Sequence, residues 1–409
     1  MKLAEIFQDG MVLQRDYELH FFGENELERV VTVRIDGMEA VKVNIPAGSF
    51  SITIPPQKTA WNATIEFVDK NGVLITLRHI RFGEVWLAGG QSNMELPMLY
   101  DREFRRLKKA KLSERIFFYE VPKRYAPIPE TEKINKQGRW LPCTPETLDR
   151  WAAVPYYFAN QLSDLLPDCP IGVVSCTFGG SNLLCWLPKE IVEGDASLRP
   201  FYRTYEEHCS QLDRAEYEAH FLSDLSAREK PGFRRLVGEM YLRGKFPPII
   251  SRMRWKGNQE PLPSQKDFGP WDSNRPCGLY ESMFSTIIGT VFRGVIWYQG
   301  ESEANAERAP LYTHTMELLV SHWRKVLGAQ LPFMTVVLPR FECDIMDNGV
   351  LFPEIRNQQR ALPEQIDNLY TVEDFASGTA YNVHSPHKRG IGEKLAQESV
   401  KVVYSPITR

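Results

Sequence analysis

The stretch Gly83-Glu84-Val85-Trp86-Leu87-Ala88-Gly89-Gly90-Gln91-Ser92-Asn93-Met94-Glu95 runs from apolar residues through paired glycines into Gln-Ser-Asn. Val85, Trp86 and Leu87 are typical of a buried strand, and glycine permits backbone angles that other residues resist. The stretch therefore predicts a strand that delivers Ser92 to a tight turn, where the next segment starts with unpaired backbone N–H groups. A serine placed there is a candidate nucleophile with an oxyanion site beside it. The alternative is that Ser92 serves only as a turn or N-cap residue.

Before this stretch, short runs of alternating apolar residues recur at regular spacing, and turn residues separate them. Period-two runs spaced in this way predict a small antiparallel β-sandwich over residues 1–82. This part holds no cluster of catalytic residue types, so we expect a structural or docking role for it. The runs cover residues 31–35, 41–45, 51–54, 64–68 and 73–77.

After residue 83, strand-like runs alternate with helix-like segments, which is typical of an α/β fold with a parallel sheet. In that architecture ligands bind at the carboxyl ends of the strands. We expect residues 83–409 to form this domain, with residues 188–270 as a polar helical insertion that is either a substrate lid or a solvated helical pair. The predicted strands cover residues 172–175, 294–298, 332–338 and 369–372, and the predicted helices 151–162 and 309–324.

Composition limits the class of protein. A chain of 409 residues is long enough for two domains, and a net charge of −3 gives no reason to expect nucleic acid as a partner. The seven cysteines are scattered and never in C-x-x-C spacing, which argues against a disulfide framework and a zinc site. Without the apolar core of a signal peptide or a membrane-spanning run, the sequence predicts a cytoplasmic protein with no membrane partner. It does not predict an oligomeric state.

Ester hydrolysis by a serine needs a base, a group that orients the base, and donors for the oxyanion. Of the eight histidines, His384 has the best context for the base, in a loop-like stretch before a predicted helix at residues 392–398. Gly180 follows a predicted strand, where its backbone N–H can approach a ligand closely. Gln299 ends another strand and could donate to an oxyanion, while Glu301 could accept from a substrate hydroxyl or brace the loop. The ends of successive strands in one sheet are expected to bring these groups together.

The serine motif is not the G-x-S-x-G elbow of α/β-hydrolases, because Gly90 stands two residues before Ser92 but Met94 two residues after it. Instead, the blocks at residues 83–94 and 294–302 resemble those of the sialate O-acetylesterase family within the SGNH hydrolases. The resemblance covers most of the chain and is weakest in the helical insertion. Further segments that are similar to this family lie at residues 6–15, 170–181, 275–280 and 384–396.

This resemblance implies that Ser92 is the nucleophile and His384 the base. The backbone of Ser92 and Gly180 and the side chain of Gln299 would form the oxyanion hole, and no metal or organic cofactor is implied. Arginines are candidates to bind a sialic acid carboxylate, among them Arg254. The residues that we expect to bind substrate are Gln91, Asn93, Glu301 and Arg275.

One departure from the family concerns the group that orients the base. The family usually has an aspartate two residues before the histidine, and this chain has Asn382 there. The family also has a proline directly after the histidine, whereas this chain has His384-Ser385-Pro386. An asparagine can hold an imidazole in place but cannot stabilise the imidazolium with a full charge. Three alternatives follow. Asn382 orients His384 in a weaker catalyst, a carboxylate such as Asp374 or Glu373 takes over the orienting role, or the chain has lost activity.

The sequence thus predicts a serine esterase that removes O-acetyl groups from a carbohydrate through an acyl-enzyme, with O-acetylated sialic acid as the favoured substrate. An acetylxylan esterase is an alternative, because acetylated xylose fits the same chemistry. A non-catalytic carbohydrate-binding protein on an SGNH fold is a second alternative, motivated by Asn382. A generic SGNH lipase or thioesterase is a third.

Overall fold

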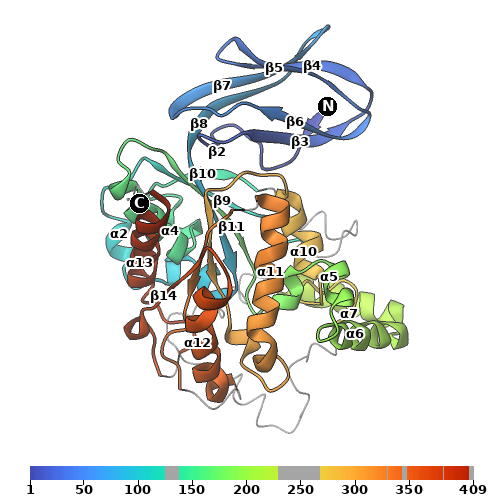
Figure 1. Cartoon of the computed structure of the whole chain (residues 1–409), viewed down its shortest axis with the longest axis vertical. Helices are drawn as coiled ribbons and strands as arrows, with labels where there is room; N and C mark the ends of the chain where they lie inside the picture. The colour runs from blue at the N-terminus through green and yellow to red at the C-terminus, as the bar shows by residue number, and fades with distance from the viewer. Residues whose placement is uncertain (125–137, 229–267, 329, 343–347, 381, 405–409) are drawn as a thin grey trace.

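A computed structural model describes residues 1–124, 138–228, 268–328, 330–342, 348–380 and 382–404. The protein is of the mixed α/β class and is built around a large, mostly parallel sheet. In Figure 1 the N-terminal strands lie at the top, and the helices surround the central sheet below them.

The N-terminal strands are antiparallel, apart from one short strand. β1 (Lys2–Leu3), β3 (Leu19–Asn25) and β6 (Gly48–Ile54) form one sheet. β4 (Arg29–Ile35) pairs with β5 (Met38–Ile45) and β7 (Ala60–Asp69), while the short β2 (Val12–Gln14) runs parallel to β8 (Gly72–Gly90). The buried rings of Phe21 and Phe67 meet edge to face at 5.2 Å between these two groups of strands. The predicted strands of this region are therefore confirmed.

β8 connects the N-terminal strands to the central sheet. Its first part pairs with β7, and Glu84 to Gly90 pair with strands of the central sheet. Residues 73–77 and 85–87, which the sequence suggested as separate runs, thus belong to one strand, and Ile80 and Phe82 between them are buried. The predicted domain boundary between residues 82 and 83 falls inside this strand.

The central sheet has the strand order β10-β9-β11-β8-β12-β13-β14, and only β10 runs antiparallel to its neighbour among the described strands. Gly90 at the end of β8 pairs with Thr177 on one side and Tyr298 on the other. The loops after β8, β11 and β12 therefore leave the sheet side by side, as predicted. The other strands of this sheet are β9 (Ile116–Glu120), β10 (Trp140–Pro142), β11 (Ile171–Thr177), β12 (Gly294–Tyr298), β13 (Phe333–Val336) and β14 (Leu369–Val372).

Helices cover both faces of this sheet. Trp86 contacts Phe158 of α4 (Ala153–Leu165), and α4 packs on α13 (Arg389–Ser399). A Cβ at Gly89 would instead meet Trp323 of α11 (Tyr312–Leu327) at 3.2 Å. Trp86 and Gly89 are an odd number of residues apart along β8 and face opposite sides, so α4 and α11 lie on opposite faces. In Figure 1, α4 and α13 accordingly lie left of the sheet and α11 in front of it at the right.

The other helices include α12, which packs on β14 and α11, and α5, α6 and α7, which belong to the predicted insertion, of which residues 229–267 lie outside the described part. They are α1 (Ser92–Glu95), α2 (Phe104–Leu107), α5 (Lys189–Gly194), α6 (Arg199–Gln211), α7 (Arg214–Arg228), α10 (Gly278–Ser282) and α12 (Asn348–Gln365). The 3-10 turns are η1 (Met98–Tyr100), η2 (Leu148–Arg150), η3 (Leu183–Trp186), η5 (Phe284–Ile287), η6 (Glu301–Glu303), η7 (Ala309–Leu311) and η9 (Phe375–Ser377), and a π-helical turn covers Val400–Tyr404.

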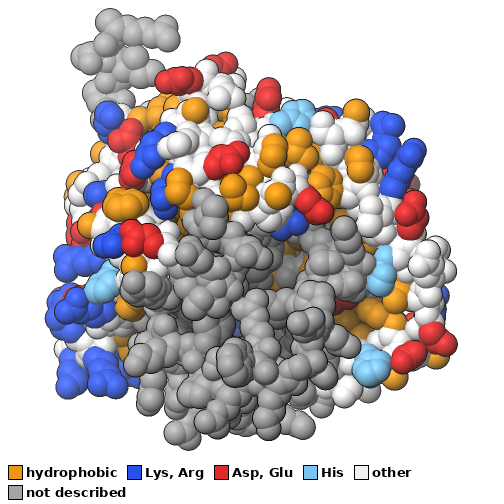
Figure 2. All heavy atoms as spheres, turned by 90° about the horizontal axis from the view of Figure 1, so that it is seen from below, with side chains coloured by type: hydrophobic (Ala, Val, Ile, Leu, Met, Phe, Trp, Pro, Cys, Tyr) orange, Lys and Arg blue, Asp and Glu red, His pale blue; other side chains and the backbone are white. Residues whose placement is uncertain are grey.

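Within the described ranges, no helix is long and apolar enough to cross a membrane. On the face shown in Figure 2, acidic, basic and hydrophobic side chains are intermixed, with Lys and Arg gathered along its left edge. The cysteines that the structure describes are free thiols, and Cys343 lies outside the described residues.

Candidate functional site

Ser92 and His384 meet at the carboxyl edge of the central sheet. Ser92 is the first residue of α1 and is buried, and its Oγ lies 2.8 Å from the His384 Nε2. His384 comes from the loop between η9 and α13, so the chain brings together two residues that lie 292 positions apart. A hydroxyl and an imidazole at hydrogen-bonding distance can exchange a proton, which is what a serine nucleophile needs from its base.

The turn that presents Ser92 depends on glycine. Gly90 has a φ of +126°, in the region that L-residues avoid. A Cβ at Gly90 would also lie 2.1 Å from the Tyr298 carbonyl oxygen. The tight glycine turn before Ser92 is therefore confirmed, and neighbouring β12 leaves no room for a side chain there.

The turn after β11 lies against Ser92. A Cβ at Gly179 would be 3.5 Å from the Ser92 Cβ, and Gly180 follows with a φ of +75°. The first N–H groups of a helix have no acceptor one turn earlier, so the Ser92 N–H at the start of α1 is available to a ligand. This places two backbone segments, but not yet a third donor, around the serine.

Gln299, the third predicted oxyanion donor, is fully buried and engaged elsewhere. Its Nε2 donates to the Glu303 Oε1 at 3.0 Å and, more weakly, to the Ser181 carbonyl at 3.4 Å. An amide nitrogen carries two hydrogens, so donation to an oxyanion would require Gln299 to release one of these partners. In the structure Gln299 braces the loops after β11 and β12.

Glu303 is a site residue that sequence reasoning missed. Its buried carboxylate accepts from the Leu183 N–H at 2.6 Å and from Gln299, and it pairs with Arg308 at 3.2 Å. Burial raises the pKa of Glu303. The sequence feature that could have identified Glu303 is its place as the second acidic residue of Gln-Gly-Glu-Ser-Glu, directly after a fully buried strand.

The predicted substrate-binding residues Gln91, Asn93 and Glu301 are all buried. Gln91 accepts from the Ser302 N–H at 3.2 Å and so ties the nucleophile turn to the loop after β12. Asn93 donates to Glu301 and to the Val383 carbonyl, 3.0 Å away. These bonds make the three residues braces of the site, and their contact with substrate stays a prediction.

Arg275 is engaged within its own segment. Its guanidinium donates to the Pro270 and Pro276 carbonyls, each at 3.1 Å, and it pairs with Glu281. Arg254, the other candidate for a substrate carboxylate, lies outside the described residues. These bonds tie the Arg275 guanidinium to its own segment, and its contact with substrate stays a prediction.

Asn382 bonds to the backbone of the base. Its Oδ1 accepts from the His384 backbone N–H at 3.0 Å. Glu373 pairs with Arg360 through both carboxylate oxygens, and the Asp374 Oδ1 accepts from Lys394 at 3.2 Å. Both alternative carboxylates are thus paired with cations, Arg360 of α12 and Lys394 of α13.

Lys388 is the second residue that the sequence analysis missed. It lies four residues after His384, is 2% exposed, and donates to the Asn93 Oδ1. Burial, together with the Lys388 charge, lowers the pKa of His384 to about 3, and burial lowers the pKa of Lys388 to about 8. The imidazole is thus neutral at physiological pH, the form in which it can accept a proton.

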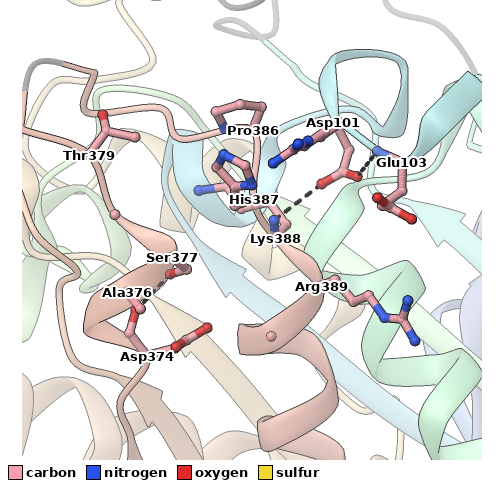
Figure 3. Close-up of a pocket in the computed structure, with 13 residues that line it drawn as sticks. Asp101, Glu103, Asp374, Ala376, Ser377, Thr379, Pro386, His387, Lys388 and Arg389 are labelled. Carbon is pink, nitrogen blue, oxygen red and sulfur yellow. Dashed lines mark hydrogen bonds between the residues drawn. The ribbon is translucent and has the colours of Figure 1, made fainter.

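A pocket of about 410 Å³ lies beside the base's loop, lined by residues of α13, the segment before it and the segment after η1. In Figure 3, Asp101 points toward the backbone of Lys388, with Pro386 and His387 next to it. Ser92 and His384 do not line this pocket. Within the described residues, no group of three or more His, Cys, Asp or Glu side chains is arranged to hold a metal ion.

Known proteins that are similar to this chain include members of the family that the motifs resemble. Residues 265–401 match the family model described as carbohydrate esterase, sialic acid-specific acetylesterase. The sialate O-acetylesterase of Mus musculus is 26% identical over 396 residues, covering 88% of this chain and 64% of that protein. The human sialate O-acetylesterase is 22% identical over 386 residues, covering 88% and 61%. The chain thus spans less than two thirds of the length of these relatives.

A solved structure of a carbohydrate acetylesterase from Xanthomonas citri has a TM-score of 0.71 and 23% identity, covering 98% of this chain and 75% of that one. At this identity the likeness shows a shared fold. The matching family model and the sialate O-acetylesterase relatives confirm the resemblance to the sialate O-acetylesterase family that the sequence motifs predicted.

Proposed function

We propose that this protein is a serine esterase that removes O-acetyl groups from a carbohydrate, with O-acetylated sialic acid as its substrate. The observation that carries the proposal is the 2.8 Å distance between the Ser92 Oγ and the His384 Nε2 at the carboxyl edge of the sheet. We choose sialic acid over xylose as the acetylated sugar because the relatives include sialate O-acetylesterases.

In the proposed reaction the Ser92 Oγ attacks the acetyl carbonyl carbon while the His384 Nε2 takes the hydroxyl proton. The N–H groups of Ser92 and Gly180 stabilise the negative charge that develops on the carbonyl oxygen. The sugar oxygen leaves with the proton from His384, and Ser92 is left acetylated. Water, deprotonated by His384, then releases acetate and restores the serine.

The finer architecture belongs to the same proposal. An SGNH-type three-layer domain from residue 83 onward would carry the site, and residues 1–82 would form a separate β-sandwich domain. The antiparallel N-terminal strands and the parallel central sheet support this division. A cytoplasmic location rests on the sequence alone.

A non-catalytic carbohydrate-binding protein is the second candidate, because Asn382 supplies no negative charge to the base. Its Oδ1 bonds to the His384 backbone N–H, which fixes the loop but does not offset the charge of an imidazolium. Under the esterase proposal, Asn382→Asp keeps that acceptor and adds the missing charge. We expect it to raise kcat/KM for an aryl acetate. If the wild type and Asn382→Asp were both inactive, the binding protein would be favoured.

The experiment that tests the proposed function is acetate release from a panel of substrates, namely O-acetylated sialic acids, acetylated xylose, a long-chain ester and a thioester. We expect the highest kcat/KM with an O-acetylated sialic acid. Preference for acetylated xylose would indicate the acetylxylan esterase alternative, and preference for the long-chain ester or thioester the generic hydrolase. No hydrolysis of any member, despite sugar binding by calorimetry, would overturn the esterase.

A further inference from the structure

The ammonium of Lys388 is buried next to the candidate catalytic pair. Its residue is 2% exposed, and its Nζ lies 5.3 Å from the centre of the Tyr298 ring. Burying a charged ammonium is costly unless other groups compensate for the lost water. A lysine kept in this place therefore calls for a role beyond packing.

The hydrogen bonds of Lys388 lead to both halves of the site. Its Nζ donates to the Asn93 Oδ1, and Asn93 follows Ser92 directly in α1. The Asn93 Nδ2 donates in turn to Glu301 and to the carbonyl of Val383, the residue before His384. One asparagine side chain thus links the helix of the nucleophile to the loop of the base, and Lys388 holds its oxygen.

The acidic and aromatic groups that face Lys388 come from three segments. Glu301 of η6 is bridged to it by Asn93, Asp101 after η1 accepts from its backbone N–H at 3.2 Å, and Tyr298 of β12 offers the face of its ring. These groups favour the charged form of Lys388. The ammonium, in turn, acts against a positive charge on His384, because Asn93 links its Nζ to the carbonyl of Val383, the residue before the base.

We propose that Lys388 is a positioning residue for the ester hydrolysis, which clamps Asn93 between the nucleophile helix and the base loop and whose charge opposes protonation of His384. This inference rests on the proposed function for its kinetic consequence. The base is then kept ready to accept a proton in acidic solution, in a site that lacks the family's aspartate. The charge effect itself is a property of the folded protein and does not depend on turnover.

The first test measures the protonation of His384 in the wild-type protein by NMR of labelled histidine rings between pH 8 and pH 4, with His384→Gln to assign the signal. We expect the His384 ring to stay neutral at pH 5. A His384 ring that titrates at the ordinary histidine value would overturn the proposal. This experiment gives a result even if no ester is hydrolysed, which is the outcome that would overturn the proposed function instead.

The second test uses Lys388→Met, with Lys401→Met as the matched control, because the Lys401 side chain is 72% exposed. Folding is checked by near-UV circular dichroism. We expect Lys388→Met to move the acidic limb of kcat/KM against pH upward by about one pH unit or more, since a neighbouring like charge lowers a histidine pKa by such amounts. We also expect kcat to fall about 10-fold with KM unchanged, and the control to behave as the wild type. If the acidic limb of kcat/KM did not move in the folded variant, the charge effect would be overturned. If kcat did not change, the positioning role would be overturned.

Discussion

At the scale of single residues, the site pairs Ser92 with a histidine that has a cation, Lys388, as its charged neighbour. The neutral imidazole is favoured, which suits proton abstraction. The imidazolium that the proposed attack would form gains no full charge from Asn382, whose Oδ1 bonds to the backbone N–H. Under the proposed function, we therefore expect a base that works over a wide pH range at the expense of rate.

The His384 pKa also predicts how stability depends on pH. The ordinary histidine pKa of 6.5 is lowered to about 3 in the folded protein, so between these values the unfolded chain binds a proton that the folded chain does not. The contribution is constant above pH 6.5, and stability is lost as pH falls from 6.5 toward 3. The free energy of unfolding of wild type relative to His384→Gln should fall by up to about 1.4 kcal/mol per pH unit in this window.

Urea denaturation of both proteins at pH 7, 6 and 5 measures this difference. His384→Gln is the reference because it lacks the titrating ring but keeps a polar side chain. A difference that stays constant from pH 7 to pH 5 would show that His384 titrates normally in the folded state.

At the scale of elements, the site depends on the turn between β8 and α1. Gly90→Ala should lower both stability and kcat/KM, because its Cβ would lie 2.1 Å from the Tyr298 oxygen and its φ is +126°. Gly328→Ala is the matched control, with a φ of +144° but no atom within 4 Å of the added Cβ. Both variants carry backbone strain of about 1–3 kcal/mol, and only Gly90→Ala adds the clash.

Thermal unfolding and aryl acetate hydrolysis of the two variants separate strain from clash. We expect Gly328→Ala to be somewhat less stable and as active as wild type, and Gly90→Ala to be less stable than Gly328→Ala and nearly inactive. Equal stability and equal activity of the two variants would contradict the close approach of β12 to this turn.

Elements with a clear pattern could be predicted from the sequence. β12 and β14 were predicted with their observed bounds, since turn or polar residues flank both apolar runs. α12 (Asn348–Gln365) was not predicted, because Pro353 and Pro363 stand inside it and proline normally interrupts a helix. Periodicity therefore found the sheet that carries the site, and missed a helix that tertiary contacts stabilise against its local sequence.

The candidate site could be predicted only in part. Strand ends and family motifs led to Ser92 and His384, whose side chains the structure brings together. Glu303 and Lys388 were missed because their importance comes from burial and from bonds to distant residues, which no local pattern contains. The orientation of the Gln299 amide depends on Glu303 and was equally hidden.

At the scale of the whole molecule, one buried carboxylate joins distant parts of the chain. Glu84 of β8 is 1% exposed and accepts from the Arg15 Nε at 2.7 Å and from the Tyr404 hydroxyl at 2.8 Å. It also accepts from Gln14 at 3.3 Å. The N-terminal strands, the central sheet and the last described turn thus meet at a single side chain.

Glu84→Gln should destabilise the protein by about 1.5–3 kcal/mol, because it removes the buried charge that accepts the Arg15 hydrogen bond. Glu342→Gln is the control, since Glu342 is exposed and pairs with Arg340 at the surface, where such a pair adds little stability. Chemical denaturation measures both variants. Equal effects in the two would contradict a central role for Glu84.

The most direct test of the proposed function is the rate of acetate release from an O-acetylated sialic acid by wild type and by Ser92→Ala, with Ser210→Ala on the exposed face of α6 as the control. If Ser92 is the nucleophile, kcat falls by about 10⁴-fold or more in Ser92→Ala and stays at the wild-type value in Ser210→Ala. A folded Ser92→Ala protein that releases acetate at the wild-type rate would contradict it.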